Sequence, residues 1–242
     1  EIIGNNEYSG RSHPTLTRCV DDAELIASAL KVGQFPGDST QMHRNLERNG
    51  TFEAVDQLCN SISSRVTCTW FHFSGHGIMD TNDNRLLTYG NDLYLVPVDS
   101  QRLEDNMRLS SVVDRLSEKP FDCLHIFTLD CCQTPCSRGV DIIQAVDSIM
   151  AARGHSFVRG GPLATIDTIY RRFGYSRRSC LHHEFVFFTA SEEGRAVDDT
   201  GLFSGQIAKY LETEDGGLLD MITLVTDEVK KQSHGKQRPV CR

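Results

Sequence analysis

The sequence has no long hydrophobic run and fewer basic than acidic residues. No apolar stretch approaches the roughly 18 residues that a membrane-spanning helix needs, and the first residues do not form a charged-then-apolar signal segment. The 25 Lys and Arg residues and 33 Asp and Glu residues give a net charge of −8. This charge disfavours binding to phosphate backbones and to anionic membranes. We therefore expect no nucleic-acid partner and no membrane partner.

The cysteines do not follow a disulfide or zinc pattern. There are nine, an odd number, and Cys131 and Cys132 are adjacent, which fits a secreted disulfide framework poorly. Reduced thiols in the cytoplasm are the interpretation we favour, with the nucleus as the alternative. The missing C-x₂-C knuckles disfavour a zinc site. Its candidate ligands, beside the adjacent pair, are Cys136, Cys180, His182 and His183.

Short apolar runs alternate with stretches of helical period along the whole chain. This alternation is typical of an α/β protein with a mainly parallel central sheet and crossover helices on both faces. We expect about six strands, at 1–3, 41–46, 66–73, 123–130, 184–190 and near 238–241. Helices are expected at 23–30, 52–62, 141–154, 201–212 and 218–229.

One domain over residues 1–242 is the simplest organisation, because the sequence has no internal repeat, low-complexity tract or long linker. The first expected strand starts at residue 1 without a polar lead-in. We therefore expect the domain to come from a longer protein.

Two of the expected strands end in chemically reactive residues. FHFSGHG (71–77) contains His76 and LDCCQ (129–133) contains Cys132, and the interval between them has room for one crossover unit and its loop. Ligands of open parallel sheets bind beyond the carboxyl ends of the strands, so we expect these two side chains to be neighbours. A thiol attacks a carbonyl as thiolate, and an imidazole can serve as its base and later protonate the leaving amine. The backbone N–H groups of Gly77 and Cys132 are the expected oxyanion donors.

Several segments in this order resemble the caspase-like cysteine peptidases, in their metacaspase and paracaspase branch. The resemblance rests on HFSGHG and LDCCQ, on IIGNNEY followed by CVDDAELIASAL, on YLVPVDS, and on FVFFTASEEGRAVDDTGLFSGQIAKYL. It implies a caspase-like fold with a large-subunit-like part (1–136), a linker-like loop (137–183) and a small-subunit-like part (184–242). It also implies that Cys132 is the nucleophile. Cys131 is expected to be a small buried residue, as free cysteine commonly is.

The resemblance further implies a pocket for a basic substrate side chain. Asp130 stands two residues before the nucleophile, where animal caspases carry Gln, and a carboxylate there would select Arg or Lys. Asp22 falls where the second pocket acid of metacaspases and paracaspases is found, and Ser74 is expected to line the same pocket. Asp198 and Asp199 are candidates for neighbouring subsites, with a solvated loop as the alternative.

The implied chemistry requires no cofactor. Calcium activation stays open, but MDTNDN (79–84) offers Asp80 and Asp83 without the spacing of an EF-hand, so no metal ligand is assigned. Protein or peptide substrates are expected, and a homodimer is the candidate assembly. The alternative function is an inactive caspase-like scaffold or dimerisation module in a signalling complex. It is suggested by Gln133, Thr134 and Pro135, which replace the His-Ser-Gly of metacaspases.

Overall fold

A six-stranded sheet forms the centre of the computed structural model, which describes residues 1–9, 13–32, 39–80, 92–131, 134–136, 183–190, 200–213 and 216–241. The strand order is β10-β9-β7-β3-β1-β2, and all neighbours are parallel except β10 and β9. The bounds are β1 Ile2–Gly4, β2 Met42–Arg44, β3 Cys68–Gly75, β7 Cys123–Cys131, β9 His183–Thr189 and β10 Val240–Cys241. All six expected strands are therefore confirmed.

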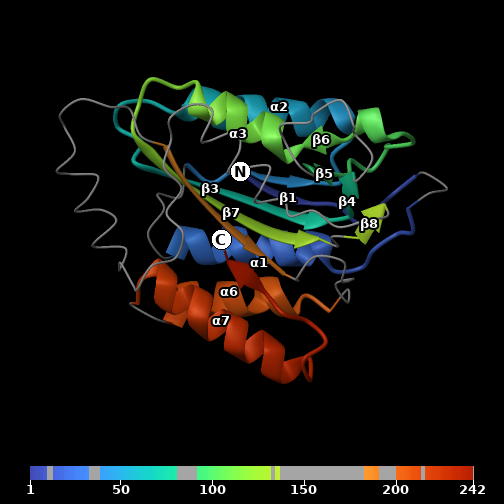
Figure 1. The fold of residues 1–242 in the computed structure, drawn as a ribbon, viewed down its shortest axis with the longest axis vertical. Helices are drawn as coiled ribbons and strands as arrows, with labels where there is room; N and C mark the ends of the chain where they lie inside the picture. The colour runs from blue at the N-terminus through green and yellow to red at the C-terminus, as the bar shows by residue number, and fades with distance from the viewer. Residues whose placement is uncertain are drawn as a thin grey trace.

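Helices cover both faces of this sheet (Figure 1), as the sequence predicts. One face carries α2 (Arg48–Ser61) and α3 (Leu109–Ser117), and the other carries α1 (Cys19–Val32), α6 (Leu202–Thr213) and α7 (Leu218–Gln232). The expected helix 141–154 lies outside the described residues, as does nearly all of the expected loop 137–183. Helix α3 was not predicted from the sequence.

Strand alternation divides the apolar side chains between two cores. Phe71, Phe73 and Phe127 pack with α2 and α3, whereas Trp70 and Ile126 pack with α1, α6 and α7. The strands are buried on both faces, so β3 and β7 are nearly continuous apolar runs, as in other parallel sheets covered by helices. Side chains at even positions of these two strands therefore face α1 and α6.

A second, four-stranded sheet continues from the ends of β3 and β7. Its order is β6-β5-β4-β8, with β4 at Gly77–Asp80, β5 at Asp92–Leu95, β6 at Met107–Arg108 and β8 at Thr134–Cys136. The pairing of β4 with β8 is parallel, and the other pairings are antiparallel. This sheet was not predicted from the sequence, and its strands are all very short.

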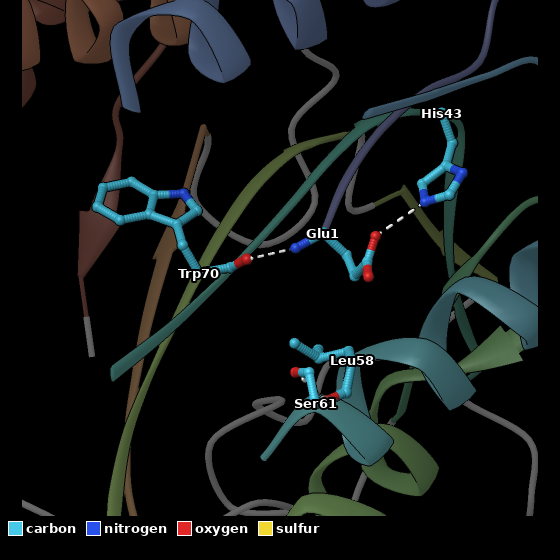
Figure 2. Close-up of polar contacts among 5 residues, drawn as sticks. All are labelled: Glu1, His43, Leu58, Ser61 and Trp70. Atoms are coloured by element: carbon cyan, nitrogen blue, oxygen red, sulfur yellow. Dashed lines mark hydrogen bonds and ion pairs between the residues drawn. The ribbon is translucent and has the colours of Figure 1, made fainter. Parts of the chain in front are cut away.

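Polar contacts fix β1 between its neighbours at the start of the sheet. The Glu1 backbone nitrogen donates to the Trp70 carbonyl at 2.8 Å, and the Glu1 carboxylate lies 2.8 Å from His43 Nε2 on β2 (Figure 2). Nearby, Ser61 donates its hydroxyl to the Leu58 carbonyl at 2.7 Å and closes the last turn of α2. Within the described ranges, no helix has the length and apolar character to cross a bilayer.

Candidate active site

The carboxyl ends of β3 and β7 lie side by side in a fixed register. Gly75 is the partner of Cys131 at the ends of these strands, and Ile78 is the partner of Thr134 where β4 pairs with β8. The sequence offset is the same in both pairs, so the register is unchanged from one sheet to the next. His76 and Cys132 are separated by this same offset. Cys132 directly follows Cys131 and lies outside the described residues.

His76 sits between β3 and β4 and is held at three atoms. Its Nε2 donates to the Pro14 carbonyl at 2.7 Å, its backbone N–H donates to the Tyr8 hydroxyl at 2.8 Å, and its carbonyl accepts from Val96 N–H at 3.1 Å. A carbonyl can only accept, so Nε2 carries the proton. In the neutral ring, Nδ1 therefore keeps its lone pair and can act as a base.

Two further aromatic rings lie beside His76. The Tyr8 ring centroid is 4.5 Å from the imidazole, and the His13 ring centroid is 5.3 Å from it. Partial burial lowers the pKa of His13, and the neighbouring His76 lowers it further. Tyr8, His13 and Pro14 were not predicted as site residues, since they lie far before His76 in the chain and no catalytic motif marks them.

The two glycines of the SGHG motif have different surroundings. A Cβ at Gly75 would lie 2.6 Å from the Tyr8 hydroxyl and 2.9 Å from the Phe73 ring, so this position has no room for a side chain. The space beside Gly75 is occupied by Tyr8 and is therefore not open to a substrate. Gly77 is buried and begins β4 opposite Leu95.

Asp130 is buried at the end of β7 and contacts the first turn of α6. Its Oδ2 accepts from the Ser204 hydroxyl at 2.6 Å and from the Ser204 N–H at 3.3 Å. The Ser204 N–H is one of the first-turn donors that have no partner within a helix. Asp130 therefore caps α6, and the helix dipole favours its negative charge.

The other two described pocket candidates lie at the same edge. Ser74 is the register partner of Asp130 and is 1% exposed. Asp22, in the first turn of α1, is 2% exposed, and its carboxylate fills the space in which Gly201 would carry a side chain. Gly201 directly precedes α6, so both carboxylates meet the same end of this helix.

Several sequence-based candidates are not part of the described site. Asp198 and Asp199 lie outside the described residues, as does Asp83, and only the backbone of Asp80 is described. No group of three or more His, Cys, Asp or Glu side chains in the described part of the chain is arranged to hold a metal. The zinc candidate His183 uses both ring nitrogens in hydrogen bonds, to His125 and to the Lys119 carbonyl.

Cys131 and Pro135 flank the nucleophile candidate and are accommodated in different ways. Cys131 is 1% exposed and packs in the core on the α2 side, as expected for a small buried residue. Pro135 lies in β8, an edge strand of the second sheet, where the missing N–H of a proline is tolerated. The register with β4 continues through this proline.

The chain thus folds as an α/β domain in which His76 follows one strand, β3, and Cys132 follows the neighbouring strand, β7, in the sequence. A family model described as caspase domain, Peptidase_C14, matches residues 2–242. The chain belongs to the caspase domain family of peptidases.

Solved structures agree with this fold. The crystal structure of protein GSU0716 from Geobacter sulfurreducens is similar, with a TM-score of 0.64 and 14% identity over 100% of this chain and 90% of that one. Caspase-1 from Spodoptera frugiperda is similar as well, with a TM-score of 0.60 and 15% identity over 100% of this chain and 86% of that one. No curated protein sequence matches the chain.

Proposed function

We propose that this protein is a cysteine endopeptidase in which Cys132 and His76 form the catalytic dyad, and that it cleaves after Arg or Lys. The observation that carries the dyad is the register. The strands before and after the two residues are paired at one constant sequence offset, which is also the offset between His76 and Cys132. This shared offset supports the proposed pairing of His76 with Cys132.

The proposed reaction begins with transfer of the Cys132 thiol proton to His76 Nδ1. The thiolate attacks the carbonyl carbon of the substrate, and the N–H groups of Gly77 and Cys132 stabilise the oxyanion. The C–N bond breaks as His76 returns the proton to the leaving amine, which leaves a thioester on Cys132. Water, deprotonated by His76, then hydrolyses the thioester and releases the acid. The bond from Nε2–H to the Pro14 carbonyl supports this role because it fixes the tautomer.

The preference for a basic P1 side chain is proposed from Asp130 and Asp22, with Ser74 beside them. Both carboxylates are buried at the strand edge that carries His76. A guanidinium or ammonium group entering such a site would form charge-assisted hydrogen bonds that an acidic side chain cannot form. For Asp198 and Asp199 we propose contacts at neighbouring subsites. Calcium activation and a homodimer remain proposals without assigned residues.

Fluorogenic peptides ending in Arg, Lys or Asp test the proposal, each with and without calcium. We expect cleavage after Arg and Lys by the wild type, and none by Cys132→Ala or His76→Ala. The matched control is Cys131→Ala, which removes the adjacent thiol from the core and should keep activity. Cleavage after Asp would contradict the pocket, and cleavage by Cys132→Ala would contradict the nucleophile. A silent wild type with no fast-reacting thiol would favour the scaffold function instead.

A further inference from the structure

Tyr8 contacts both the backbone and the imidazole ring of His76. We propose that Tyr8 is a positioning residue that fixes the orientation of the His76 imidazole. The phenol oxygen accepts from the His76 N–H at 2.8 Å and donates to the Val96 carbonyl at 3.3 Å. The Tyr8 ring lies 4.5 Å from the imidazole, centroid to centroid, at an interplanar angle of 59°.

Tyr8 belongs to a turn that is itself held by asparagine side chains. Asn45 Oδ1 accepts from the backbone N–H groups of Asn6 and Glu7, at 2.8 and 3.1 Å. The buried Asn5 donates its side-chain amide to the Val96 carbonyl at 3.2 Å, so this carbonyl accepts from the turn twice. These hydrogen bonds hold the segment that carries Tyr8, so the Tyr8 hydroxyl is a fixed acceptor for the His76 N–H.

The hydrogen bonds of Tyr8 require a neutral phenol. A hydroxyl can accept from an N–H and donate to a carbonyl at the same time, whereas a phenolate can only accept. Burial raises the pKa of Tyr8, which keeps the hydroxyl protonated. The phenol thus links the peptide group of His76 to Val96, while the Pro14 carbonyl accepts from Nε2–H of the same residue.

Gly75 provides independent support, because the chain leaves no space for a side chain where the Tyr8 hydroxyl enters. An alanine methyl there would lie 2.6 Å from this oxygen. The residue before the candidate base is therefore matched in size to Tyr8. The inference rests on the proposed function, since the orientation of His76 affects a rate only if His76 takes part in catalysis.

The test is Tyr8→Phe, which keeps the ring and removes only the hydroxyl. The His76 N–H then loses its acceptor in a mostly buried place. We expect kcat for an Arg peptide to fall about tenfold with KM changed less than about twofold, as for a misaligned catalytic group. Tyr210→Phe is the matched control. Tyr210 is also 7% exposed, and its hydroxyl donates to the Gly217 carbonyl at 3.2 Å, far along the chain from His76.

Two further measurements separate this inference from the proposed function. In ¹⁵N NMR spectra, Tyr8→Phe should shift the His76 amide and, by misaligning the ring and weakening the bond from Nε2–H to the Pro14 carbonyl, mix the two imidazole tautomers. Tyr210→Phe should do neither. Unchanged kcat, or a rise in KM alone, in an active enzyme would overturn the positioning role. If the wild type cleaves nothing, the proposed function fails. A His76 spectrum that Tyr8→Phe leaves unchanged would then overturn the positioning role as well.

Discussion

Ser204, the third residue of α6, donates both its hydroxyl and its backbone N–H to one oxygen of Asp130 at the end of β7. This contact joins a helix start to the strand that leads to the nucleophile position. Asp130 therefore has a stabilising role in the fold in addition to the substrate-binding role we propose. The two roles make different predictions.

For stability, we predict that Ser204→Ala lowers the free energy of unfolding by about 1–2 kcal/mol, because a hydrogen bond to a buried carboxylate is lost. Urea denaturation measures this change. Thr213→Ala is the matched control, since its hydroxyl bonds the Lys209 carbonyl at the exposed end of the same helix. We expect a change within about 0.5 kcal/mol there. Equal losses in the two variants would show that the hydrogen bond to Asp130 stabilises the fold no more than the exposed hydrogen bond of Thr213 does.

For specificity, we predict that Asp130→Asn lowers kcat/KM for Arg peptides on the order of 10²-fold, because a buried charge that pairs with the substrate is lost. Asparagine keeps an acceptor for Ser204, so the fold should persist, and thermal unfolding checks this. Ser204→Ala should keep its preference for Arg over uncharged P1 residues. An Asp130→Asn enzyme that retains Arg cleavage within about threefold would remove Asp130 from the pocket.

Gly201 tests whether the Asp22 carboxylate is closely packed against the start of α6. Gly201 and Gly235 both have positive φ, of 65° and 76°, but only Gly201 has the Asp22 carboxylate where a Cβ would go. We predict a loss of about 1–2 kcal/mol for Gly235→Ala from backbone strain alone. Gly201→Ala should cost about 1–3 kcal/mol more and should weaken Arg cleavage. Equal losses would mean that Asp22 moves aside easily.

The central sheet could be predicted from the sequence because its strands are buried on both faces. β7 is buried at every position from Cys123 to Cys131, so its apolar run has clear limits. The sequence also predicted that the ends of β3 and β7 lie close together, since parallel strands bring their carboxyl ends to one edge of the sheet. The dyad of His76 and Cys132 rests on this expectation and stays a prediction.

The missed features have two different causes. The stripe of α3, at Leu109, Val112, Val113 and Leu116, has helical spacing and was available in the sequence. By contrast, the very short strands of the second sheet carry too little periodicity to be recognised. The contact of Tyr8 with His76 joins distant parts of the chain and depends on the folded geometry alone. Composition and spacing carry no information about such a contact.

A chain of buried hydrogen bonds crosses three strands at the opposite end of the sheet from His76. His183 Nε2 donates to the Lys119 carbonyl, so in neutral rings His183 Nδ1 accepts from His125 Nε2–H, and His125 Nδ1 accepts from the Thr69 hydroxyl. Burial, together with the neighbouring His183, lowers the pKa of His125 to about 3. Burial also lowers the pKa of His72 to about 3.

These two histidines make stability depend on pH with a defined sign. Both are neutral in the folded and unfolded states above about pH 6.5. As the pH falls from there towards 3, only the unfolded chain takes up the protons, so stability decreases by up to about 1.4 kcal/mol per pH unit for each. Between pH 6 and 5, where carboxylates contribute little, we predict that His125→Gln reduces the slope of unfolding free energy against pH by about a third to a half, because the lowered pKa of His13 adds to the slope as well. His234→Asn, at an exposed turn, should leave the slope unchanged. Urea titrations at several pH values measure both slopes, and an unchanged slope in His125→Gln would mean that His125 takes up its proton without unfolding.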